Sequence, residues 1–70
     1  MNYEAEKELL IGAIEACIEI AQAVEKVRKT FPDLVELCNE ITKHERTQMR
    51  ELTDKLVEIK REHAKQLHQK

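Results

Sequence analysis

The sequence predicts an all-α protein, an antiparallel two-helix hairpin that assembles as a dimeric four-helix bundle. The 70 residues include one proline, Pro32, and one glycine, so a single strong helix breaker separates two long stretches. Charged residues make up 37% and hydrophobic residues 41% of the chain, with only one Tyr and one Phe, as is typical of long helices. We expect residues 1–70 to form one domain, a single hairpin with helices over 3–29 and 33–68 and a turn over 30–33.

The first predicted helix, 3–29, is defined by apolar residues that recur in steps of three and four. This stripe contains Leu10, Ile14, Cys17, Ala21, Val24 and Val27. Glutamates load its first turns and basic residues load its last turn, which suits the helix dipole.

The turn is predicted at Thr30-Phe31-Pro32-Asp33. Proline is tolerated in the first turn of a helix, because its missing N–H has no partner there. Thr30 and Asp33 have the spacing of a capping box, although proline also disfavours helical geometry at Phe31. Both Thr30 and Phe31 therefore remain candidates for the N-cap, and we expect Phe31 to cover the end of the hairpin.

The second predicted helix, 33–68, has a longer apolar stripe with a polar interruption. Residues 42–48 contain no apolar side chain, but no Gly or Pro breaks them, so we predict continuous helix there. Folding the chain at Pro32 places Val24 opposite Cys38 and Leu10 opposite Leu52. The first helix then ends near Leu56, and we expect a C-terminal overhang that contains Ile59, His63 and Leu67.

The first helix carries more apolar surface than one facing helix can cover, and such surplus marks an interface. Ile11 and Ile18 form one series seven residues apart, and Leu9, Ala16 and Ala23 form another. We expect a homo-oligomer, most simply a dimer. Its predicted interface consists of Leu10, Ile11, Ile14, Ile18, Leu52, Leu56 and Ile59. We expect the C-terminal overhang to pack on the second subunit, to fray, or to bind another protein.

Charge and targeting signals argue against several classes of partner. The net charge is −2, and the basic C-terminal tail (Lys55, Lys60, Arg61, Lys65 and Lys70) is interrupted by Glu58 and Glu62. A nucleic-acid footprint is usually denser, so we do not expect nucleic acid as a partner. The chain has no stretch of 18 apolar residues and no signal peptide, so we expect no membrane association and a cytoplasmic location.

The candidate metal ligands are Glu40 and His44, four residues apart and therefore on one helix face. Glu15 or Glu19 of the first helix would complete a carboxylate/histidine site inside a dimer, but a solvated Glu–His pair is the simpler interpretation. Cys17 and Cys38 fall about two turns apart across the hairpin, so we expect free thiols that pack as small hydrophobic residues. His63 and His68 are expected on the surface. We therefore predict no metal and no cofactor.

No catalytic constellation is apparent. The chain lacks a Gly-rich phosphate loop, a serine triad and paired catalytic carboxylates, and two helices form a poor concave pocket. We therefore predict a small non-enzymatic protein–protein interaction module, acting as an adaptor, inhibitor or regulator. The alternatives are the metal-binding dimeric bundle, and a small ligand or nucleic acid bound between subunits with the basic tails at the mouth of the site.

Overall fold

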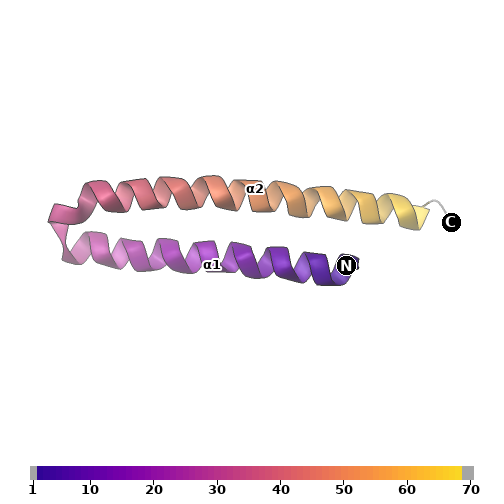
Figure 1. Ribbon diagram of the computed structural model, residues 1–70, viewed down its shortest axis with the longest axis horizontal. Helices are drawn as coiled ribbons and strands as arrows, with labels where there is room; N and C mark the ends of the chain where they lie inside the picture. Colours follow the sequence, from indigo (N-terminus) through magenta and orange to yellow (C-terminus); the bar gives the residue numbers. More distant parts are fainter. Residues whose placement is uncertain (1, 69–70) are drawn as a thin grey trace.

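The computed structural model describes residues 2–68 and consists of two long helices that lie side by side and antiparallel (Figure 1). The elements are α1 (Tyr3–Thr30), the short 3-10 helix η1 (Pro32–Leu34) and α2 (Val35–His68). The molecule is a rod of 58 × 16 × 15 Å. Because no strand occurs anywhere in residues 2–68, the predicted all-α class and the hairpin are confirmed.

Helix α1 starts at Tyr3 because Asn2 caps it. The Asn2 side-chain Oδ1 accepts a hydrogen bond of 2.8 Å from the backbone N–H of Ala5, and so satisfies one of the free donors of the first turn. Glu4 and Glu6 in the first turn and Arg28 and Lys29 in the last turn have the signs that the helix dipole favours.

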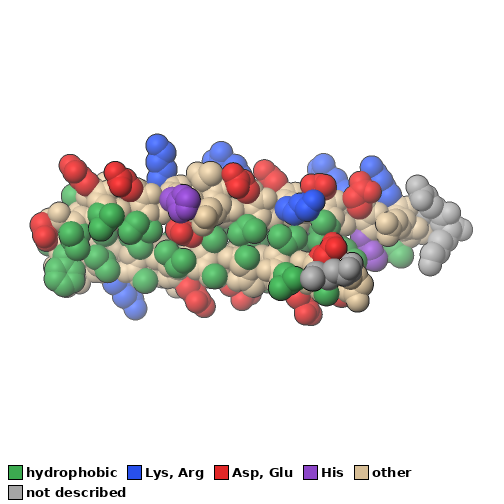
Figure 2. All heavy atoms as spheres, in the orientation of Figure 1, with side chains coloured by type: hydrophobic (Ala, Val, Ile, Leu, Met, Phe, Trp, Pro, Cys, Tyr) green, Lys and Arg blue, Asp and Glu red, His purple; other side chains and the backbone are tan. Residues whose placement is uncertain are grey.

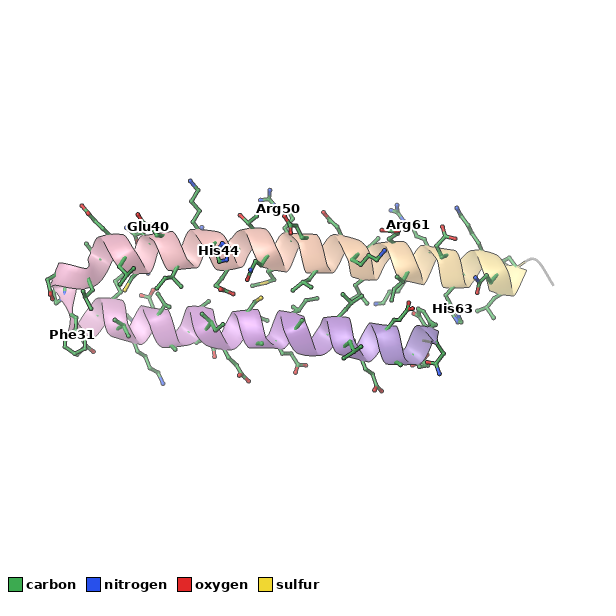
Figure 3. The ribbon with its side chains drawn as sticks, viewed as in Figure 1. Phe31, Glu40, His44, Arg50, Arg61 and His63 are labelled. Carbon is green, nitrogen blue, oxygen red and sulfur yellow. The ribbon has the colours of Figure 1, made fainter. Side chains whose placement is uncertain are left out.

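The turn differs from its prediction in three respects. Thr30 is the last residue of α1, and its hydroxyl donates to the Lys26 carbonyl (2.9 Å), so the Thr30–Asp33 capping box does not form. Pro32–Leu34 form η1, which delays the start of α2 to Val35 instead of residue 33. Phe31 lies at the turn end of the hairpin with half of its surface exposed, and therefore does not cover the core (Figure 3).

Helix α2 is continuous from Val35 to His68, so the prediction of uninterrupted helix across residues 42–48 is confirmed. Two threonines in this stretch keep their hydroxyls bonded within the helix. Thr42 donates to the Cys38 carbonyl (2.9 Å) and Thr47 donates to the Lys43 carbonyl (3.2 Å). Neither hydroxyl therefore breaks the helix by competing for backbone partners elsewhere.

The two helices meet along a narrow strip that we call the seam. Its fully buried apolar side chains, among the residues described, are Cys17, Val24 and Cys38. The remaining apolar members are half-buried: Leu10, Ile14, Ala21, Ile41, Met49, Leu52, Leu56 and Ile59. Three fully buried apolar side chains are a very small core for a chain of this length, because small domains already bury less of their surface than large ones.

Two seam positions are charged, and the apolar stripe did not predict either of them. Four residues after Val24 comes Arg28, whereas the predicted stripe ended at Val27, which is 37% exposed. Stepping from Cys38 through Thr42 reaches Glu45, which is 7% exposed although it lies in the predicted polar patch. The three-and-four spacing of paired helices therefore identifies these charged seam positions, whereas a search for hydrophobic residues alone misses them.

The predicted C-terminal overhang is shorter than expected. The Tyr3 and His63 rings stack with their centroids 3.8 Å apart, and Ile59 and His63 are half-buried. Helical side chains lean toward the N-terminus of their own helix, so Tyr3 reaches along α2 toward its C-terminal end. His63 is consequently part of the hairpin rather than a free surface histidine, whereas Leu67 remains exposed.

Candidate functional site

An apolar groove runs along one side of the seam, and we call this side the groove flank. The groove has a volume of about 480 Å³, and its lining includes Ala13, Ala16 and Ile20 from α1 and Glu45 and Gln48 from α2. Helical periodicity extends the same face toward the turn, to Ala23 and Val27 on α1 and to Leu37 and Ile41 on α2. Figure 2 shows hydrophobic side chains over both helices on the face where Figure 3 labels His44.

The opposite side of the seam is more polar, and we call it the arginine flank. Its groove, of about 590 Å³, includes Arg28 from α1 and Thr42, Arg46 and Arg50 from α2. Ile11 and Ile18 border this flank on α1 and are 38% and 41% exposed. On α2 the exposed Val35 and Val57 lie at the two ends of the same flank, with Arg46 and Arg50 between them.

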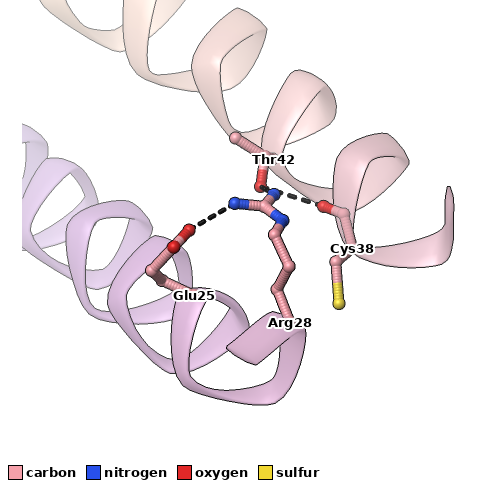
Figure 4. A network of polar contacts seen from close by, with 4 residues as sticks. All are labelled: Glu25, Arg28, Cys38 and Thr42. Atoms are coloured by element: carbon pink, nitrogen blue, oxygen red, sulfur yellow. Dashed lines mark hydrogen bonds and ion pairs between the residues drawn. The ribbon is translucent and has the colours of Figure 1, made fainter. Parts of the chain in front are cut away.

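Arg28 anchors a local polar network at the turn end of the seam (Figure 4). Its Nη1 is paired with Glu25 one turn earlier, and its Nη2 donates to the Thr42 hydroxyl at 3.1 Å. Thr42 in turn donates to the Cys38 carbonyl. The network joins α1 to α2, although the Arg28 Nε is buried and has no hydrogen-bond partner among the described residues.

Glu45 lies in the middle of the seam and is not held by a network of hydrogen bonds like that of Arg28. Its Oε2 is shielded from solvent and has no hydrogen-bond partner within the part of the chain that the structure describes. Burial raises the pKa of the Cys17 thiol, and a hydrogen bond to the Glu45 carboxylate and its negative charge raise that pKa further. The Cys17 thiol is therefore poorly ionised near neutral pH, and nucleophilic chemistry at this position is disfavoured.

The candidate metal ligands do not converge within one hairpin. Glu40, His44, Glu15 and Glu19 are all exposed, and Figure 3 shows Glu40 directed away from α1. In residues 2–68 no group of three or more His, Cys, Asp or Glu side chains is placed to hold a metal ion. Cys17 and Cys38 are free thiols, 6% and 1% exposed, as expected for small buried residues.

The residues predicted for an interface fall into two groups. Leu10, Ile14, Leu52, Leu56 and Ile59 are half-buried in the seam, where they join the two helices of one chain. Ile11 and Ile18 remain exposed beside it. The groove flank had only a partial signal in the sequence, the Leu9, Ala16 and Ala23 series, because the contribution of α2 depends on the register of the hairpin.

The basic tail is a solvated helix end with local ion pairs. Lys55 pairs with Glu58 at 3.4 Å and Lys65 pairs with Glu62 at 3.9 Å, all with well-exposed side chains. Such surface pairs contribute little to stability. Lys70 lies outside the described residues.

Known proteins offer no match: no family model fits this chain, and neither a curated protein nor a solved structure is significantly similar to it. Over residues 2–68 neither helix has a segment long and apolar enough to cross a membrane.

Proposed function

We propose that this protein is a small non-enzymatic interaction module that self-associates through its apolar helix faces, most simply as a dimeric four-helix bundle. As an adaptor, inhibitor or regulator, it would present the outer faces of that bundle to another protein. A reducing, cytoplasmic setting is part of the proposal and is supported by the two free, buried thiols.

The observation that carries the proposal is the mismatch between buried and exposed apolar side chains. Among residues 2–68 three apolar side chains are buried, whereas large apolar side chains of both helices, Leu9, Ile20 and Leu37 among them, are exposed. Isolated helical hairpins of this size rarely bury enough apolar area to offset the entropy of ordering the chain. A second helical surface would supply the missing burial.

The test is the mass of the protein in solution, measured by light scattering after size exclusion over a wide range of concentrations. We expect a dimer whose melting temperature rises with protein concentration, because dissociation is then coupled to unfolding. A folded monomer at all concentrations would contradict self-association and would leave only a different protein as partner for the exposed faces.

A further inference from the structure

We infer that the groove flank, rather than the arginine flank, is the surface on which a second copy of this chain packs. The inference rests on the proposed self-association and deepens it by naming the face. This face consists of Ala13, Ala16, Ile20 and Val27 on α1 with Leu37 and Ile41 on α2.

The shape of the groove flank suits close packing of helices. Small side chains alternate with large ones along α1, where Ala13 and Ala16 precede Ile20 and Ala23 precedes Val27. Small residues let helix backbones approach, and the large residues between them fill the holes of a facing helix. On the arginine flank, Arg46 and Arg50 occupy the corresponding positions of α2, and two such faces would bring like charges together.

One full side of the hairpin is large enough for a stable dimer. Helix α1 has 28 residues and is about 42 Å long, so a side 16 Å wide offers roughly 670 Å² per copy when the whole length of α1 is used. Two copies packed along that whole length would cover about 1,300 Å², which lies within the range of specific interfaces.

The test uses two isoleucines that differ mainly in the flank they occupy. Ile20 is 44% exposed on the groove flank, and Ile18 is 41% exposed on the arginine flank of the same helix. We expect Ile20→Glu to raise the dimer dissociation constant at least tenfold, measured by light scattering across concentrations. The matched variant Ile18→Glu should leave the dissociation constant within about twofold of the wild type.

A second measurement holds even if Ile20→Glu leaves a monomer that does not fold. A thiol placed by Ala16→Cys on the groove flank should become protected from a maleimide as protein concentration rises. A thiol placed by Gln22→Cys, an exposed position one turn after Ile18 on the arginine flank, should react equally fast at all concentrations. The buried native thiols provide the slow background in both variants.

The outcomes separate this inference from the proposed function. A wild-type protein that stays monomeric overturns both. If the wild type is a dimer and Ile18→Glu dissociates it while Ile20→Glu does not, or if both substitutions weaken it equally, only the assignment of the interface to the groove flank is overturned. Equal labelling of Ala16→Cys at all concentrations also overturns it, because a covered thiol cannot react at the rate of a free one.

Discussion

Arg28 and Glu45 are the two charged residues in the seam, and they are accommodated in different ways. Arg28 lies near the turn with about a quarter of its side chain exposed, and Glu25 and Thr42 bind its terminal nitrogens. Glu45 lies nearer the middle of the seam, almost fully buried, with the Cys17 thiol beside it and one oxygen without a partner. Within residues 2–68 each of the two keeps one buried atom without a partner, Arg28 Nε and Glu45 Oε2. At the end of the seam, however, the Arg28 guanidinium reaches solvent and two partners, whereas at the middle the Glu45 carboxylate has only the Cys17 thiol beside it.

The largest effect on stability is expected from Glu45→Leu, which removes the carboxylate that has an unpartnered oxygen in the seam. Leucine is similar in size and needs no hydrogen bond, so we expect the free energy of unfolding to increase by about 2 kcal/mol. Urea unfolding at neutral pH measures it. The control is Glu40→Leu, an exposed glutamate directed away from α1, which should change stability by less than about 0.5 kcal/mol. A loss of stability in Glu45→Leu would show that the carboxylate is satisfied in solution.

A smaller effect, this time a loss of stability, is expected from Arg28→Ala, which removes the better satisfied of the two charges. The variant loses the bond to Thr42 and the packing of the arginine stem, while Glu25 is left partly in solvent. We expect the free energy of unfolding to fall by about 1 kcal/mol. Arg46→Ala, an exposed arginine of the same flank, is the matched control. Equal effects of the two variants would mean that the Arg28 network contributes nothing beyond an ordinary surface arginine.

The smallest effect concerns Cys17 and alkaline pH. Its pKa is raised in the folded protein, so the unfolded chain loses this proton first as the pH rises. The thiol therefore contributes stability that is complete below the ordinary cysteine pKa of about 8.5 and is lost as the pH rises through the folded value. Urea unfolding of wild type and Cys17→Ala, compared between about pH 7 and about pH 10, isolates this contribution. An identical pH dependence in both proteins would contradict it.

Much of the fold was predictable because it depends on local signals. Pro32 marked the connection, and the absence of a breaker between Ile41 and Met49 marked continuous helix. Of the two N-cap candidates, Phe31 precedes η1, whereas the Thr30 hydroxyl bonds back to the helix that Thr30 ends and not to the one that follows. That choice depends on where α1 stops, which is among the least certain features of a sequence.

The candidate site was less predictable, because it depends on which residues of two helices meet. The sequence showed that the first helix has more apolar residues, the exposed isoleucines among them, than one facing helix can cover. Hydrophobicity gave no reason, however, to place Arg28 or Glu45 in the seam. The stack of Tyr3 on His63 depends on side-chain direction at the far ends of both helices, and a count of residues from the turn stopped near Leu56, about two turns short of it. Register is a property of the pair and not of either helix.

The connection through η1 has a consequence for how the hairpin forms. Every contact between α1 and α2 joins residues at similar distances from the turn, so chain closure is least costly beside Phe31 and most costly at Tyr3 and His63. The helices should therefore join from the turn outward, like a zipper, and separate first at the open end. Backbone amides near Asn2 and His63 would then exchange with solvent through small local openings, while those near Val24 and Cys38 would exchange only when the whole hairpin opens.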